Sequence, residues 1–157
     1  MTGSLQKQIP TIYQLDGVFD DGKHDYHLRV QYEDTDAGGI VYHAQYLAFA
    51  ERARSAWLRC LEIDQPRLLS QEKQAFVVRH MDIDFLQVAA LGDVLGVASE
   101  VAKIGAARVT LRQTITNVQF CLIVARLIVE IGFVNLQSAG VARACRMPPD
   151  ILKKLAS

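Results

Sequence analysis

The sequence contains little cysteine and no closely spaced cysteine pair. Its three cysteines, Cys60, Cys121 and Cys145, lie far apart, and no C-x-x-C spacing occurs. An odd number of widely separated cysteines argues against a disulfide framework and against a cysteine zinc site. We therefore expect reduced thiols, as in a cytoplasmic protein.

An excess of charge and a long hydrophobic run are also missing. Seventeen Lys and Arg residues balance seventeen Asp and Glu residues, so we expect no nucleic-acid partner and no general affinity for membrane surfaces. The most hydrophobic stretch, residues 120–134, is too short to span a bilayer and contains Arg126 and Glu130. The first ten residues have no apolar core, which argues against a signal peptide.

Internal repeats and linkers are absent as well. A chain of 157 residues corresponds to about one domain, and its 50% hydrophobic and 22% charged residues are typical of a globular protein. Residues 1–22 are polar, include Pro10 and show no periodicity, so we interpret them as an irregular leader. We expect residues 23–157 to form a single domain.

A long amphipathic helix is predicted over residues 44–61. Apolar side chains recur there at spacings of three and four: Tyr46, Phe49, Ala50, Ala53, Trp57, Cys60 and Leu61. This spacing gives the helix one buried face. After Pro66, residues 67–73 are expected to form a short second helix or turn, and a short terminal helix is expected after Met147.

Five further segments have the pattern of strands. Alternating or apolar residues occupy residues 24–32, 76–86, 93–104, 108–118 and 120–136. Val77, Met81 and Ile83 are expected on one side of their strand, and residues 120–136 are apolar on both faces, as in a central strand or one covered by a partner subunit. One helix followed by long antiparallel strands can bury its apolar face only if the sheet wraps around it. This predicts an α+β hotdog fold with five to six strands.

The most informative segment is residues 30–54, where a cluster of acids, two glycines and the start of the long helix follow one another. Asp36 is expected on a turn beside the helix start, whose unpaired N–H groups and partial positive charge can hold an oxyanion. Gly38 and Gly39 permit a tight turn and close approach of a ligand. A carboxylate facing an oxyanion hole is the minimum equipment for attack on a carbonyl.

The motif in residues 32–46, Tyr-Glu-Asp-Thr-Asp-Ala-Gly-Gly-Ile-Val-Tyr-His-Ala-Gln-Tyr, resembles hotdog-fold acyl-CoA thioesterases of the 4-hydroxybenzoyl-CoA thioesterase/YbgC type. The resemblance implies hydrolysis of acyl-CoA by a homodimer or homotetramer with sites at the subunit interface, and no cofactor beyond the CoA of the substrate. In the YbgC branch it also implies an association with the Tol-Pal cell-envelope system. The family's catalytic aspartate falls on Asp36 and its motif histidine on His43, whereas Arg108 stands where relatives often carry a serine.

Asp36 is the expected catalyst, either as nucleophile or as a base that orients water, although it could instead cap the helix or close an Asx turn. The backbone amides of Tyr42, His43 and Ala44 are the expected oxyanion hole, and the His43 side chain is expected to position the acyl carbonyl. Asp34 and Asp36 supply only two ligands, so no metal is expected. Asp34 is expected to tune Asp36 or to be solvated.

Other polar residues near the motif have less specific roles. Tyr46 is expected in the core or lining the acyl pocket. Glu51 and Arg54 are expected to form a solvated helix pair, with Glu51 as a weaker catalytic alternative. His24 and His27 are interpreted as surface residues.

Arginines are the candidates for the phosphates of CoA. Arg79 interrupts an apolar series, and a charge in that position needs a partner or a polyanion. Arg108 and Arg112 form an outward row on the fourth predicted strand. For each of these residues, a solvated strand face is the alternative interpretation.

Two other classes of function compete with the thioesterase. A hotdog scaffold for envelope or lipid-synthesis partners would have no need of Asp36 and its glycine loop. A dehydratase acting on acyl carrier protein should carry a His-Phe-Pro loop, which this chain lacks. The acyl group stays open between short aliphatic, long fatty and aromatic chains, and acyl carrier protein thioesters remain alternative substrates.

Overall fold

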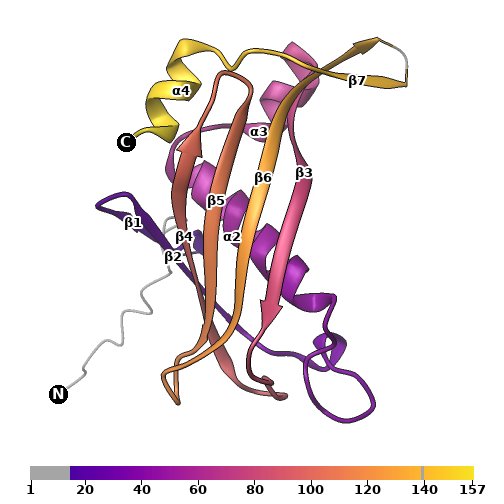
Figure 1. The fold of residues 1–157 in the computed structure, drawn as a ribbon, viewed down its shortest axis with the longest axis vertical. Coiled ribbons are helices and arrows are strands. Elements are labelled where there is room, and N and C mark those ends of the chain that lie inside the picture. Colours follow the sequence, from indigo (N-terminus) through magenta and orange to yellow (C-terminus); the bar gives the residue numbers. More distant parts are fainter. Residues whose placement is uncertain (1–14, 139) are drawn as a thin grey trace, which may run out of the picture.

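In the computed structural model, which describes residues 15–138 and 140–157, a curved antiparallel sheet wraps around one long helix (Figure 1). The strands are β1 (Val18–Asp20), β2 (Lys23–Arg29), β3 (Gln74–Phe85), β4 (Val94–Ile104), β5 (Arg108–Asn117), β6 (Leu122–Ser138) and β7 (Val141–Ala144). Their order in the sheet is β1-β2-β4-β5-β6-β3, and β7 pairs with β6. The helices are the short η1 (Tyr32–Asp34), the central α2 (Gln45–Cys60), α3 (Gln65–Arg67), the π-helix η2 (Leu68–Glu72) and α4 (Pro149–Leu155).

The hotdog arrangement is therefore confirmed, with seven strands in place of the expected five to six. The two additional strands are β1 and β7, which have only three and four residues. Strands this short carry no alternation that a sequence pattern could reveal. Across the described residues, the structure contains no helix with the length and hydrophobicity needed to cross a membrane.

The core lies between α2 and the concave face of the sheet. Phe49, Ala50 and Ala53 of α2 are fully buried. They belong to one hydrophobic cluster with Leu95 of β4 and Leu111 of β5. The two alanines allow the helix backbone to approach the sheet closely, and the burial of a residue such as Phe49 contributes about 1.5–3 kcal/mol. The predicted buried face of the helix is confirmed.

The side-chain phase of β3 differs from the prediction. Its pairing with β6 shifts between Val78 and His80, so that Arg79 is the extra residue of a β-bulge. Val77 consequently pairs with Gly132 on the outer face, whereas Met81 pairs with the buried Val129 on the helix side. The placement of Val77 with Met81 and Ile83 was wrong because a bulge reverses the alternation of a strand.

The apolar segment near residue 130 forms β6, which lies between β5 and β3 in the sheet. Its inner side chains Leu127 and Val129 are buried, while Ile128 on the outer face is 41% exposed. The prediction of a central strand is confirmed. The edge position falls instead to β3, so one side of its backbone has no partner strand among the described residues.

The N-terminal segment also differs from the prediction. Residues 1–14 of the predicted irregular leader lie outside the described residues, but its last part contains β1, which pairs with β2. His24 is fully buried rather than on the surface, with Nε2 2.6 Å from the carbonyl oxygen of Asp16, and burial lowers the pKa of its imidazole. His27 is exposed, as predicted.

Candidate active site

The turn that carries Asp36 is held by a set of short-range hydrogen bonds. The Gly38 N–H donates to Asp36 Oδ1 at 2.8 Å, and the Gly39 N–H donates to the Asp36 carbonyl oxygen at 3.0 Å. Asp36 therefore closes an Asx turn, as the alternative interpretation proposed. The same bond fixes the carboxylate, and Oδ2 has no partner among the described residues. The turn geometry and a catalytic role are compatible.

The two glycines suit this turn for different reasons. Gly39 has a φ of 74°, where only glycine is free of backbone strain. A Cβ at Gly38 would lie 3.2 Å from Asp36 Oδ1, closer than an ordinary contact. A side chain at Gly38 would thus press on the carboxylate itself. The positive φ of Gly39 and the close contact at Gly38 agree with the expected tight turn.

The turn is anchored to the rest of the fold through backbone bonds. The Val41 N–H donates to the Ala89 carbonyl oxygen at 2.8 Å, and the Leu91 N–H donates to the Gly39 carbonyl oxygen at 3.1 Å. These bonds connect the Asp36 turn to the segment between β3 and β4. A site residue on an anchored turn keeps its orientation, which general-base or nucleophilic chemistry requires.

Asp34 has a structural role, and the alternative that it is solvated was wrong. It is only 2% exposed, and its Oδ2 accepts from the Gln31 N–H at 2.8 Å. Its Oδ1 is buried with no hydrogen-bond partner among the described residues. The two acids of the Asp-Thr-Asp sequence therefore differ in environment: Asp34 is buried at the end of η1, and Asp36 is exposed on the turn.

The start of α2 leaves two backbone amides unused. The helix begins at Gln45, and Ala44 at the N-cap provides no side-chain cap. The Tyr42 N–H donates to the Asp34 carbonyl oxygen at 2.9 Å, so it is not available as an oxyanion donor. The amides of His43 and Ala44 have no acceptor among the described residues. Unpaired amides at a helix start carry the partial positive charge that stabilises an anion.

Aromatic and apolar side chains surround this helix start. His43 is exposed, its ring 4.4 Å from Tyr42 and 6.3 Å from Phe85 between centroids. Tyr46 lies beneath them and is buried, its hydroxyl accepting from the Ala89 N–H at 3.2 Å, and burial raises the pKa of its phenol. Phe85 and Val88 remain 50% and 68% exposed, giving the site an apolar rim.

Glu51 and Arg54 form the expected pair, but only Glu51 is solvated, because the Arg54 side chain is buried. The Arg54 guanidinium is 4% exposed and donates to Gln113 Oε1 at 2.8 Å as well as to Glu51. The Gln113 amide in turn donates to the Ala50 carbonyl oxygen and to Ser99. This buried network joins α2 to β4 and β5. Gln113 interrupts an inward-facing apolar series in β5, a signal that the sequence did contain.

Arg79 and Arg108 lie together, away from Asp36. Both donate to Glu130 Oε1 at 3.0 Å on the outer face of the sheet. Phe85 lies six positions after Arg79 along β3, a distance of about 20 Å at roughly 3.3 Å per strand residue. Arg112 is exposed on the same face and pairs with Ile128. Within one chain, the structure does not bring these arginines to the Asp36 turn.

The fold and this site define a class of protein: a hotdog-fold protein with an exposed carboxylate on the turn that precedes a helix start with unpaired amides. Residues 38–119 match the thioesterase superfamily. The chain is 42% identical over 109 residues to the acyl-CoA thioesterase YbgC of Haemophilus influenzae, covering 69% of this chain and 79% of that protein. The chain belongs to the thioesterase superfamily, and the predicted family is confirmed.

Solved structures agree with this assignment. A probable thioesterase from Bartonella henselae is 36% identical, with a TM-score of 0.72 over 80% of this chain and 99% of that one. The 4-hydroxybenzoyl CoA thioesterase from Pseudomonas sp. strain CBS-3 has a TM-score of 0.77 at 16% identity, over 85% of this chain and 99% of that one. The second similarity shows the hotdog fold alone.

Proposed function

We propose that this thioester hydrolase acts on acyl-CoA, releasing the free acid and CoA, with Asp36 as its catalytic group. The observation that carries the proposal is the Asp36 carboxylate, fixed through one oxygen by the Gly38 N–H at 2.8 Å and exposed through the other. The name of the Haemophilus influenzae relative supports acyl-CoA as the substrate.

Two chemical routes fit this arrangement. In the first, Asp36 Oδ2 attacks the thioester carbon, the C–S bond breaks, and water then hydrolyses the mixed anhydride. In the second, Asp36 takes a proton from water, whose oxygen attacks the same carbon, and the CoA thiolate leaves. Both routes place negative charge on the carbonyl oxygen, which the amides of His43 and Ala44 can stabilise. The His43 side chain is assigned to positioning the carbonyl, beside Tyr42.

We also propose that the working enzyme is a homodimer or homotetramer. Phe85, Leu86 and Val88 are exposed apolar residues beside the site, and β3 offers an unpaired edge next to them. A second copy that covers this region would exclude water from the thioester. We expect light scattering at micromolar concentration to give a multiple of the 17.5 kDa chain mass. A mass of one chain would contradict the proposal.

The cellular setting is proposed from the family resemblance. Similarity to YbgC proteins supports a cytoplasmic enzyme associated with the Tol-Pal system, and acyl carrier protein thioesters remain alternative substrates. Copurification of tagged protein with Tol-Pal components or acyl carrier protein would test these partners.

The experiment that tests the function is a panel of acyl-CoA substrates, from short aliphatic to long fatty and aromatic acyl groups, followed by release of free thiol. We expect turnover of at least one class, because Tyr46 and Phe85 give the helix start an apolar wall. Binding of acyl-CoA without thiol release across the whole panel would favour the scaffold alternative instead.

A further inference from the structure

The connection between β3 and β4, residues 86–93, joins the start of α2 to the Asp36 turn. Ala89 in this connection is fully buried. Its N–H donates to the Tyr46 hydroxyl of α2 at 3.2 Å, and its carbonyl oxygen accepts from the Val41 N–H at 2.8 Å. Figure 1 shows the connection at the lower end of the sheet, beside the loop that precedes α2. One residue therefore links a side chain of the helix to the turn.

The Asp36 turn is a small closed unit, so it follows the connection to which it is fastened. The Asp36 N–H donates to the Ile40 carbonyl oxygen at 2.9 Å, and the Gly39 N–H donates to the Asp36 carbonyl oxygen at 3.0 Å. Ile40 forms a β-bridge with Ala90 of the connection. The Leu91 N–H donates to the Gly39 carbonyl oxygen at 3.1 Å. A shift of the connection would therefore carry the carboxylate with it.

Tyr46 presents its hydroxyl to Ala89 from a fixed position. Its side chain is buried, and its ring packs edge-on against Phe49 and Phe85, with centroids 6.1 and 5.8 Å away. Burial raises the pKa of the phenol, so the hydroxyl stays neutral. A phenylalanine would fill the same space, but it would leave the buried Ala89 N–H without an acceptor, which is costly. The hydroxyl is therefore the group that fastens the connection to α2.

A second anchor fastens the connection to the sheet. Asp93 Oδ2 accepts from the Ala90 N–H at 2.9 Å and from Asn117 Nδ2 at 2.8 Å, at the end of β5. This anchor places the connection relative to the strands. The unpaired amides at the start of α2 belong to the helix, so the Tyr46 bond relates the turn to them directly. Attack on a carbonyl depends on this relation, and an error of about 1 Å can cost roughly a hundredfold in rate.

We propose that Tyr46 is a positioning residue for thioester hydrolysis: through Ala89, its hydroxyl sets the place of the Asp36 turn relative to the unpaired amides at the start of α2. The inference rests on the proposed function, in which Asp36 attacks the thioester or activates water and these amides hold the oxyanion. The hydroxyl itself exchanges no proton with the substrate. Its loss displaces the carboxylate, while the ring, and with it the apolar wall of the site, stays in place.

The first test is Tyr46→Phe, which removes the hydroxyl and keeps the ring. At a temperature well below melting, we expect kcat for acyl-CoA to fall about tenfold and KM to stay within about twofold, because the apolar wall is retained and the geometry of attack is not. Tyr26→Phe is the matched control: Tyr26 of β2 packs against the core, and its hydroxyl forms no hydrogen bond with a described residue. A Tyr46→Phe enzyme with a lower melting temperature but normal kcat would overturn the proposal, because the hydroxyl would then be structural alone.

The second test combines Tyr46→Phe with Asp36→Asn. If Tyr46 acts through the Asp36 carboxylate, misplacing the turn costs nothing once that charge is absent. The double variant should then match Asp36→Asn in kcat within about twofold. A further loss of about tenfold in the double variant would overturn the proposal, because Tyr46 would then act on the substrate or on the whole fold.

Hydrogen exchange followed by mass spectrometry tests the place of the turn without using activity. We expect the amides of residues 36–41 to exchange faster in Tyr46→Phe than in the wild type or Tyr26→Phe, with the middle of α2 unchanged. Unchanged exchange in both the turn and the connection would overturn the proposal, even if kcat were reduced. The same data separate it from the proposed function: near-normal turnover in Asp36→Asn would contradict the catalytic role of Asp36, while faster exchange would still show that Tyr46 fastens the turn.

Discussion

The two ends of α2 differ in how their backbone groups are satisfied. At the start, Ala44 offers no cap, and the amides of His43 and Ala44 have no acceptor among the described residues. At the end, the Ile63 N–H donates to the Leu58 carbonyl oxygen and the Glu62 N–H donates to that of Arg59, each at 2.9 Å. This pair of bonds is a Schellman motif, which closes a helix completely.

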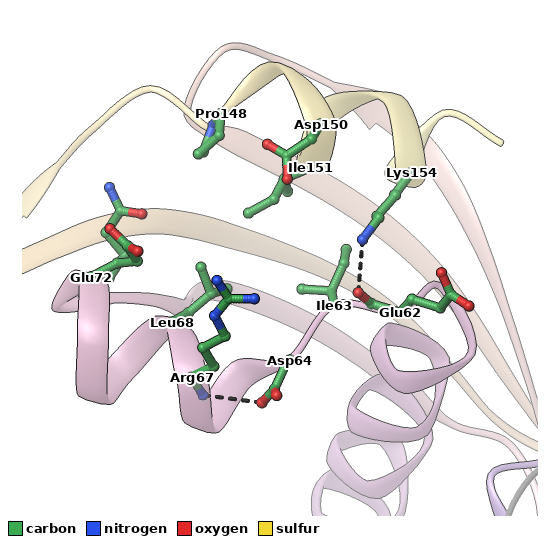
Figure 2. A pocket seen from close by; sticks show the side chains of 11 residues that line it. Glu62, Ile63, Asp64, Arg67, Leu68, Glu72, Pro148, Asp150, Ile151 and Lys154 are labelled. Atoms are coloured by element: carbon green, nitrogen blue, oxygen red, sulfur yellow. Dashed lines mark hydrogen bonds between the residues drawn. The ribbon is translucent and has the colours of Figure 1, made fainter.

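The side chains around the two ends of α2 also differ in whether their polar groups are paired. Figure 2 shows a cavity beside the end of α2, about 340 Å³ in volume, where Lys154 donates to the Glu62 carbonyl oxygen at 2.8 Å. In the same view Asp64 Oδ1 caps α3 by accepting from the Arg67 N–H at 3.0 Å. Polar groups there bind one another. The start of α2 combines free amides, an exposed carboxylate and apolar side chains, and we place the proposed active site there on the strength of these unsatisfied groups.

The largest difference between the two ends of α2 is expected when the negative charge beside the helix start is removed. Asp36→Asn keeps the size and the bond from Gly38, but it removes the nucleophile or base. We expect kcat to fall by at least about a hundredfold, within the range for positioned base catalysis, with CoA binding and melting temperature nearly unchanged.

The matched control is Glu33→Gln, an exposed acid in the same loop, which should retain full turnover. Steady-state kinetics and thermal denaturation of the wild type, Asp36→Asn and Glu33→Gln test whether the loss of turnover is specific to Asp36. Near-normal turnover in Asp36→Asn would move the catalytic role to another group, first of all Glu51 or His43.

A smaller effect is expected from Gly38→Ala. The new Cβ would lie 3.2 Å from Asp36 Oδ1 and displace the carboxylate by a few tenths of an ångström. We expect kcat to fall about tenfold without loss of stability, because positioning errors of this size are costly to catalysis. Gly22→Ala provides the contrast: its φ is 74° and nothing lies within 4 Å of the new Cβ, so it should lower stability and leave kcat intact. If Gly38→Ala and Gly22→Ala changed kcat equally, the loss in Gly38→Ala could not be attributed to a contact with the Asp36 carboxylate.

His43→Ala should have a still smaller effect, about threefold to tenfold in kcat. The proposed oxyanion donor is the backbone amide, which survives the substitution, and only the positioning by the ring beside Phe85 is lost. Kinetics with a saturating acyl-CoA measure this. A loss as large as that of Asp36→Asn would show that the imidazole takes part in proton transfer.

Much of the fold was predictable because periodicity is a local property. The buried face of α2 and the alternation of β5 follow directly from spacing, and both are confirmed. The phase of β3 was not predictable, because one extra residue at Arg79 reverses the alternation and nothing in the neighbouring residues marks it. His24 was misassigned because the segment that covers it, around Asp16, has no periodic signal of its own.

In the candidate site, too, local features were predictable from the sequence and features that depend on folding were not. The motif located Asp36, the glycines and the helix start, since these are consecutive in the sequence. It could not show that the Tyr42 amide is bound by Asp34, because that bond depends on how the loop folds back. The sharing of Glu130 by Arg79 and Arg108 depends on strand register, which sequence spacing alone does not determine.

The smallest expected effect lies at the end of α2 and concerns stability alone. Glu62 has a φ of 57° in the position of the Schellman motif that favours glycine. Glu62→Gly should therefore stabilise the protein by about 0.5–1 kcal/mol in urea denaturation, with kcat unchanged. Glu62→Ala removes the same carboxylate but keeps the backbone strain, so it should show none of this gain. If Glu62→Ala stabilised equally, the gain would come from removing a negative charge near the helix end, and a change in kcat for either variant would mean that the two ends of α2 are not independent.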